Sequence, residues 1–159
     1  MQLQATTDYG VRVMCCLYAQ ETLITATELS EQLYISYPYL MKVLGQLRQS
    51  GMIEVVRGRF GGYRMAEGSQ NITLYDIIKT MEGEILVNSC MSKNGVCTRN
   101  AIDTCPVHKV FESVQKQLIC SFENVKLSDI ADLIQQKNIV TAEVNQTECM
   151  SLADMYNHM

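Results

Sequence analysis

The chain lacks any run of about 18 consecutive apolar residues, the length that a membrane-spanning helix needs. Residues 1–10 also lack the basic region and the apolar region of a secretory signal. No segment has the composition of collagen-like, low-complexity or broadly disordered chains. We therefore expect a folded, cytoplasmic protein that has no membrane partner.

Side chains that commonly carry catalysis are scarce. The chain has two histidines, one of them near its end, so the sequence indicates no Ser/His/Asp set. The glycines at 58, 61 and 62 fall in a predicted hairpin and do not open a helix, as those of a phosphate-binding loop would. These features argue against an enzyme.

Cysteine, in contrast, is plentiful. Seven cysteines are an odd number, and without a secretory signal they indicate reduced thiols instead of a disulfide framework. A chain of 159 residues, 47% of them hydrophobic, can bury a core without disulfides. No cysteine falls between Cys16 and Cys90, whereas three fall within residues 90–105. This uneven spacing makes residues 90–105 a candidate site.

The net charge of −4 argues at first against a nucleic-acid partner, but the charge is unevenly distributed. Residues 1–66 carry six basic and five acidic side chains, so the excess of acid lies in residues 67–159. Residues 57–64 contain Arg57, Arg59 and Arg64 and no acid. Because the local field matters more than the total charge for binding a polyanion, the N-terminal half is the candidate DNA-binding part.

Apolar periodicity predicts helices over residues 8–19, 25–33 and 36–50. Thr25 with Glu28 forms a capping box, and Ser36 with Pro38 in the following turn marks the start of the third helix. Strands are predicted at 52–56 and 63–65. Further helices follow over 73–81, where Thr73 and Asp76 repeat the capping box, and over 106–122 and 128–136.

Three helices followed by a hairpin are typical of a winged helix-turn-helix. The expected fold class is mostly α with a small β-hairpin (α+β), and a long C-terminal helix follows. We predict a DNA-binding domain over 1–82, a cysteine-containing loop over 83–105, dimerisation helices over 106–136 and a polar tail over 137–159. The alternative is a small α+β domain without a nucleic-acid role.

The third helix is the predicted recognition helix, whose N-terminal, outward side chains reach base edges in the major groove. Hydroxyls bond phosphates, lysine bonds a phosphate or guanine, and glutamine can reach adenine. The predicted contacts are Ser36, Tyr37, Tyr39, Lys42 and Gln46. Tyr34, Tyr37 and Tyr39 are also expected to pack the second helix against the third. The alternative is an ordinary solvated helix face.

The hairpin is the predicted wing. A wing needs glycines for close approach to DNA and arginines for the negative potential of the minor groove. The predicted contacts here are Arg57, Arg59, Tyr63 and Arg64. The alternative is a glycine-rich turn with incidental charge.

Several motifs together resemble those of the IscR/NsrR (Rrf-two, BadM-type) transcriptional regulators, over about residues 1–135. They are Thr7-Asp8-Tyr9-Gly10-Val11-Arg12, Leu40-Met41-Lys42-Val43-Leu44, Arg57-Gly58-Arg59-Phe60-Gly61-Gly62-Tyr63 and the trio Cys90, Cys97 and Cys105. The resemblance implies a homodimer that binds palindromic double-stranded promoter DNA, with the helix from residue 106 in the dimer interface. In the cluster-binding members, three loop cysteines hold an iron–sulfur cluster that controls DNA affinity.

The spacing Cys90-x6-Cys97-x7-Cys105 suits thiolate ligands on a flexible loop. It is not a CxxC pair, which disfavours a zinc ribbon but leaves a Cys3His zinc site or three free thiols open. The resemblance implies a [4Fe–4S] or [2Fe–2S] cluster.

A fourth ligand has two candidates. His108 lies three residues after Cys105, on the same side of a helix start, and resembles the histidine of IscR-type members. Asp8 of the other subunit resembles the aspartate of NsrR-type members, which respond to nitric oxide. Asp8 could instead be only a helix N-cap. The Leu40-Met41-Lys42-Val43 stretch resembles NsrR-type members more closely. Met41 stands where IscR-type members carry a base-reading glutamate, so their DNA sequence preference is not expected of this chain.

The expected function is therefore a transcriptional regulator, specifically a repressor, whose promoter affinity is set by an iron–sulfur cluster. The signal would be nitric oxide, redox state, or the supply of iron or clusters. The alternative is a winged-helix regulator without a cluster, switched by cysteine thiol oxidation or by a partner protein or small molecule.

Overall fold

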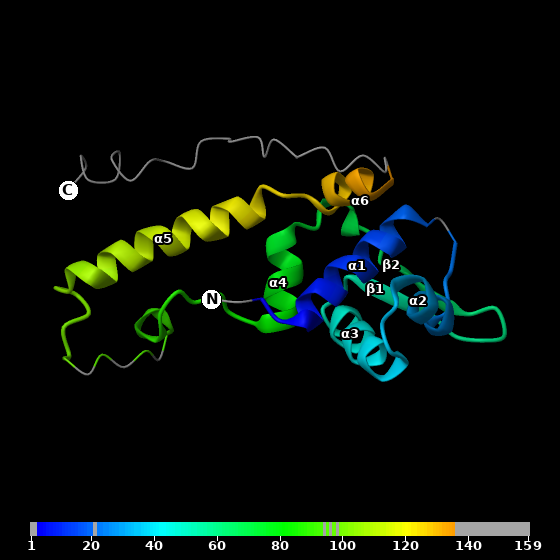
Figure 1. The fold of residues 1–159 in the computed structure, drawn as a ribbon, viewed down its shortest axis with the longest axis horizontal. Helices are drawn as coiled ribbons and strands as arrows, with labels where there is room; N and C mark the ends of the chain where they lie inside the picture. Colours follow the sequence, from blue (N-terminus) through cyan, green and yellow to red (C-terminus); the bar gives the residue numbers. More distant parts are fainter. Residues whose placement is uncertain (1–2, 21, 94, 96, 98, 136–159) are drawn as a thin grey trace.

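The computed structural model describes residues 3–20, 22–93, 95, 97 and 99–135. Figure 1 shows the elements in chain order. They are α1 (Ala5–Ala19), α2 (Ala26–Leu33), α3 (Tyr37–Gln49), β1 (Ile53–Val56), β2 (Gly62–Met65), η1 (Ser69–Asn71), α4 (Leu74–Glu82), η2 (Ser89–Met91), α5 (Pro106–Glu123) and α6 (Leu127–Gln135). This order confirms the predicted fold class, a mostly helical chain with one antiparallel hairpin.

Two helices begin as their local sequence predicts. Thr25 accepts the Glu28 backbone N–H at 3.3 Å, and the Glu28 carboxylate accepts the Thr25 N–H at 2.8 Å. The hydrogen bonds that the Thr25 backbone N–H and hydroxyl donate to this carboxylate lower the pKa of Glu28. Thr73 and Asp76 form the second predicted capping box, at the start of α4. Ser36 occupies the N-cap position of α3, but its side chain makes no capping hydrogen bond.

Helix α1 starts earlier than predicted. It begins at Ala5 with Gln4 as its N-cap residue, so Asp8 lies inside the helix and is not the cap. The cause is a tertiary contact, since one carboxylate oxygen of Glu82 accepts the Gln4 backbone N–H at 2.8 Å and the Thr7 hydroxyl at 2.6 Å. The end of α4 thereby holds the first turn of α1.

The core lies between α1, α2, α3, α4 and the hairpin. Its fully buried side chains include Met14, Leu17, Leu29, Leu40, Leu44, Leu47, Ile53 and Ile77. The hairpin pairs Ile53 with Met65 and Val56 with Gly62. It is joined to the body where Ile24 and Tyr63 exchange backbone hydrogen bonds of 3.1 and 2.8 Å. The wing therefore has a fixed position relative to the helices.

The loop after α4 leads away from the winged body, and α5 runs back toward it, so that α6 lies beside α1 (Figure 1). The sequence predicts one pair of dimerisation helices over 106–136. In the structure Leu127 and Ala131 of α6 are buried in the core of the winged body, and α5 alone projects from it. The predicted polar tail over 137–159 lies outside the described residues. None of the helices that the structure describes is long and apolar enough to span a membrane.

Candidate nucleic-acid interface and cysteine loop

Helix α3 buries one stripe and exposes the opposite face. Leu40, Val43, Leu44 and Leu47 form its buried side. Four of the predicted contact residues, Ser36, Tyr37, Tyr39 and Lys42, are exposed at or near its N-terminal half. That is the arrangement a recognition helix needs in order to bring its first two turns to base edges.

The prediction that the tyrosines pack α2 against α3 is wrong for Tyr34, and the side chains of Tyr37 and Tyr39 are only partly covered. Tyr34 is 94% exposed, Tyr39 is 58% exposed and Tyr37 is 49% exposed. Tyr34 ends α2 in a left-handed conformation with φ of 54°, which ends the helix at that residue, and its side chain is left in solvent. The neighbouring Ile35, 2% exposed, supplies the apolar contact instead. All three phenol rings are thus available to a partner.

Gln46 differs from the other predicted contacts of α3. Its side chain is half-buried, and within the described part of the chain its Oε1 is a buried atom without a hydrogen-bond partner. A buried polar atom without a partner is costly. Gln46 would have to rotate outward before it could reach a base edge.

The wing ends in a tight turn. The Gly61 N–H donates to the Gly58 carbonyl oxygen at 3.0 Å, so Arg59 and Phe60 are the two central residues of a β-turn. Gly61 is required here, because a Cβ at that position would lie 2.1 Å from the Val56 carbonyl oxygen. Arg57 and Arg59 are exposed, as predicted for a wing.

The other two predicted wing residues have partners within the protein. Arg64 pairs with Glu54, the residue directly opposite it on β1. Tyr63 packs against the hydrophobic core. Among the predicted contact residues, the exposed cations without an ion-pair partner in the described part of the chain are therefore Arg57 and Arg59 of the wing and Lys42 of α3.

The candidate metal ligands lie in the loop between α4 and α5 and at the start of α5. Cys90 Sγ is 3.4 Å from His108 Nδ1, while Cys97 and Cys105 line one pocket of about 110 Å³. Backbone N–H groups of Ala101 and Arg99 lower the pKa of Cys97. Within the described residues no three metal-binding side chains are gathered into one site. The structure thus brings Cys90 close to His108 and places Cys97 and Cys105 on one pocket, but it does not bring the two pairs together into one site.

The second candidate fourth ligand, Asp8, lies on α1 and outside this loop. Its carboxylate is exposed and forms an ion pair with Arg12 one turn later, at 2.7 Å. The structure describes one chain, and in that chain His108 is the candidate that contacts a loop cysteine.

Two contacts that the sequence does not predict tie the loop to its surroundings. The Val87 N–H donates to Gln115 Oε1 of α5 at 3.0 Å. Glu82, which directly precedes the loop, holds the first turn of α1. Both contacts join residues far apart in the chain, and a single sequence contains no signal for such pairs. The loop is consequently linked both to α5 and to the winged body.

Residues 3–133 match the sequence model of the family described as Rrf2, iron-dependent transcriptional regulator. Among curated proteins, the chain is 30% identical over 138 residues to "Protein aau3" of Rhizobium meliloti (strain 1021). That match covers 86% of this chain and 87% of the relative.

Similar solved structures include CymR (YrzC), the global cysteine regulator of B. subtilis, with 22% identity and a TM-score of 0.62. That match covers 83% of this chain and 97% of CymR. IscR of T. potens has 23% identity and a TM-score of 0.64, with 98% and 96% of the two chains covered. At these identities the structures support the shared fold alone.

Proposed function

This chain belongs to the Rrf2 family of transcriptional regulators, and on that premise we propose that it is a homodimeric repressor whose affinity for palindromic promoter DNA is set by an iron–sulfur cluster. The signal would be nitric oxide, redox state, or iron or cluster supply. The observation that carries the DNA-binding part is the exposed start of α3, with Lys42, beside a wing that presents Arg57 and Arg59.

The proposed homodimer is supported by α5. Val107, Val110 and Val114 are 55%, 40% and 38% exposed, and their spacing places them on one side of the helix. An apolar stripe on a projecting helix is buried when two copies pair about a twofold axis. A twofold dimer presents two copies of α3, which is the physical reason to expect a palindromic site.

The residues present fit an iron–sulfur cluster by their chemistry. Cys90, Cys97 and Cys105 supply three thiols and His108 supplies an imidazole that already contacts Cys90. A bound cluster would supply an iron centre that reacts with small effectors. Asp8 of the partner subunit remains the other candidate ligand, and it would have to give up its ion pair with Arg12 to serve.

The loop's attachments suggest how the cluster would control DNA affinity. The loop follows Glu82, which holds the start of α1. Its residues Val87 and Cys90 contact Gln115 and His108 of α5. A change in the loop can then alter how α5 of each subunit is placed relative to its winged body. If the two arrangements space the recognition helices differently, the affinity for DNA differs between them.

The test of the cluster is anaerobic purification, followed by an absorption spectrum and iron and sulfide assays. We expect Cys90→Ser, Cys97→Ser and Cys105→Ser to lose iron and sulfide. The control is Cys120→Ser on α5, outside the loop, which should retain both. Asp8→Ala and His108→Ala then identify the fourth ligand, since only the variant that removes it should bleach. Wild-type protein without iron and sulfide, even after anaerobic reconstitution, would contradict the cluster.

One observation favours a second candidate, a regulator without a cluster that is switched by thiol oxidation. Cys97 and Cys105 line the same pocket, as two thiols that oxidise to a disulfide must be near each other. In that case the purified protein contains no iron or sulfide, and a mild oxidant removes two free thiols and changes DNA affinity. Cys97→Ser should abolish that response. If a partner protein or small molecule controlled the regulator instead, the oxidant would not change the DNA affinity of the wild-type protein.

A further inference from the structure

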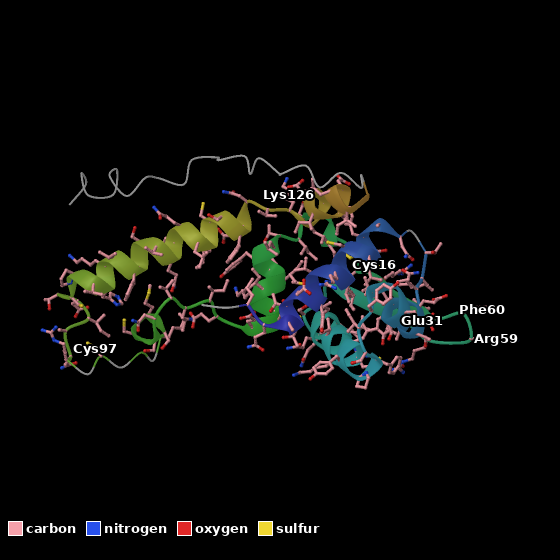
Figure 2. All side chains as sticks on the ribbon, in the orientation of Figure 1. Cys16, Glu31, Arg59, Phe60, Cys97 and Lys126 are labelled. Carbon is pink, nitrogen blue, oxygen red and sulfur yellow. The ribbon has the colours of Figure 1, made fainter. Side chains whose placement is uncertain are left out.

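We propose that Phe60 is an apolar wedge that enters the minor groove of the bound DNA and opens a base step beside Arg59. The proposal rests on the proposed DNA binding and adds a residue that the sequence analysis did not assign to the interface. Figure 2 shows Arg59 and Phe60 together at the tip of the β1–β2 loop, at the opposite end of the molecule from Cys97.

The fold itself does not use the Phe60 ring. The side chain is 86% exposed, whereas the chain's other two phenylalanines, Phe111 and Phe122, are both partly buried. A large aromatic side chain in water gains nothing for folding, because its stabilising contribution comes from burial. The ring becomes favourable only when a partner covers it.

The turn geometry presents the ring outward. Phe60 and Arg59 are the central residues of the turn closed by the 3.0 Å bond from Gly61 to Gly58. The neck of the loop is narrow, since Gly61 lies against the Val56 carbonyl oxygen. The hairpin is in turn fixed to the body through Ile24 and Tyr63. The ring therefore sits at the end of a braced projection, as a wedge requires.

The charge around the ring identifies the partner. The Arg59 guanidinium lies over the Phe60 ring, 5.6 Å from its centroid, and Arg57 is exposed nearby in the chain. Residues 57–64 contain no acid. The narrow minor groove attracts arginine through its negative potential, and phenylalanine is among the side chains that insert between base steps there. An apolar protein surface would not favour two adjacent cations.

The experiment uses the full chain and the selected duplex, which is the DNA that the protein enriches from a random-sequence library. Fluorescence anisotropy measures affinity, and 2-aminopurine placed through the duplex reports unstacking. We expect Phe60→Ala to bind about tenfold more weakly, with an unchanged dependence on salt because no charge is lost. We expect Phe60→Leu, which keeps an apolar wedge, to retain part of the affinity.

The controls separate the ring from the charge and from the fold. Arg59→Ala should lower the slope of affinity against salt by about one. Phe60→Ala and Arg59→Ala should both unfold at the wild-type temperature, because the Phe60 and Arg59 side chains are exposed. Wild-type binding should raise 2-aminopurine fluorescence at one step, and Phe60→Ala should not.

Two results would overturn the wedge while leaving DNA binding intact. In the first, Phe60→Ala binds the selected duplex as tightly as the wild type. In the second, Phe60→Ala binds weakly but the wild type unstacks no base step, so that the ring only contacts the backbone. Failure of the wild type to select any duplex would instead refute the proposed function, and the wedge with it.

Discussion

Gly45 is the position at which stability and DNA binding should respond in opposite directions. It lies inside α3 and is exposed, and a Cβ built there meets nothing within 4 Å. Glycine inside a helix costs about 0.5–1 kcal/mol relative to alanine. Gly45→Ala should therefore raise the free energy of unfolding by that amount. For a chain of this size the melting temperature should rise by about 2–4 °C per kcal/mol.

The same substitution should weaken DNA binding. Gly45 follows Lys42 by three residues and Met41 by four, so all three share one exposed face of α3. If that face enters the major groove, the glycine allows the helix backbone to approach the bases, and a methyl group removes that space. We expect Gly45→Ala to bind the selected duplex more weakly, and Gly45→Gln to bind more weakly still.

The assay is thermal unfolding and fluorescence anisotropy on the same preparations. A lower melting temperature for Gly45→Ala would contradict the packing argument. A higher melting temperature with wild-type affinity would mean that this face of α3 does not dock on DNA. Only the combination of a more stable protein and weaker binding supports the account.

Three further predictions concern the wing, the charges and a helix cap. Gly61→Ala places a methyl group against the Val56 carbonyl oxygen, so it should deform the wing. We expect this variant to bind DNA more weakly and to melt at a lower temperature. If Gly61→Ala bound DNA as tightly as the wild type, the wing would be dispensable. Lys42→Ala should reduce the slope of DNA affinity against salt concentration by about one. Lys116→Ala, which removes an ion-pair partner on α5, should leave that slope unchanged. Equal slopes for Lys42→Ala and the wild type would exclude Lys42 as a phosphate contact. Because the folded-state pKa of Glu28 is lowered, its stabilisation is complete above the ordinary value of 4.5 and is lost as the pH falls below it. Urea unfolding should therefore find Glu28→Gln less stable at neutral pH but equal to the wild type in acid; a deficit that persisted in acid would contradict the cap.

Features specified by neighbouring residues could be predicted from the sequence. The capping boxes at Thr25 and Thr73 and the turn at Gly61 depend on side chains only a few residues apart. The family match confirms the resemblance drawn from the wing and cysteine motifs, and the fold class is confirmed with it. Whether the chain is closer to NsrR or to IscR stays a prediction.

Features that depend on tertiary contacts could not be predicted. The start of α1 depends on Glu82, and the packing of α6 depends on Leu127 and Ala131 reaching the core. The outward direction of Tyr34 depends on its left-handed backbone conformation at the end of α2. Glycine usually occupies such a position, so the tyrosine gives no sequence signal for it. The cysteine spacing likewise gave no indication that His108 would contact Cys90 while Cys97 and Cys105 share a separate pocket.

If the cluster controls transcription, DNA affinity must depend on the state of the cysteine loop. The most direct measurement is anaerobic fluorescence anisotropy of the wild-type protein with the selected duplex, first with its cluster and then after the iron has been removed by a chelator. We expect two different affinities of the wild-type protein for the same DNA, and a single affinity of the Cys97→Ser protein under both treatments. Equal affinities of the cluster-loaded and cluster-free wild-type protein would contradict control of DNA affinity by the cluster.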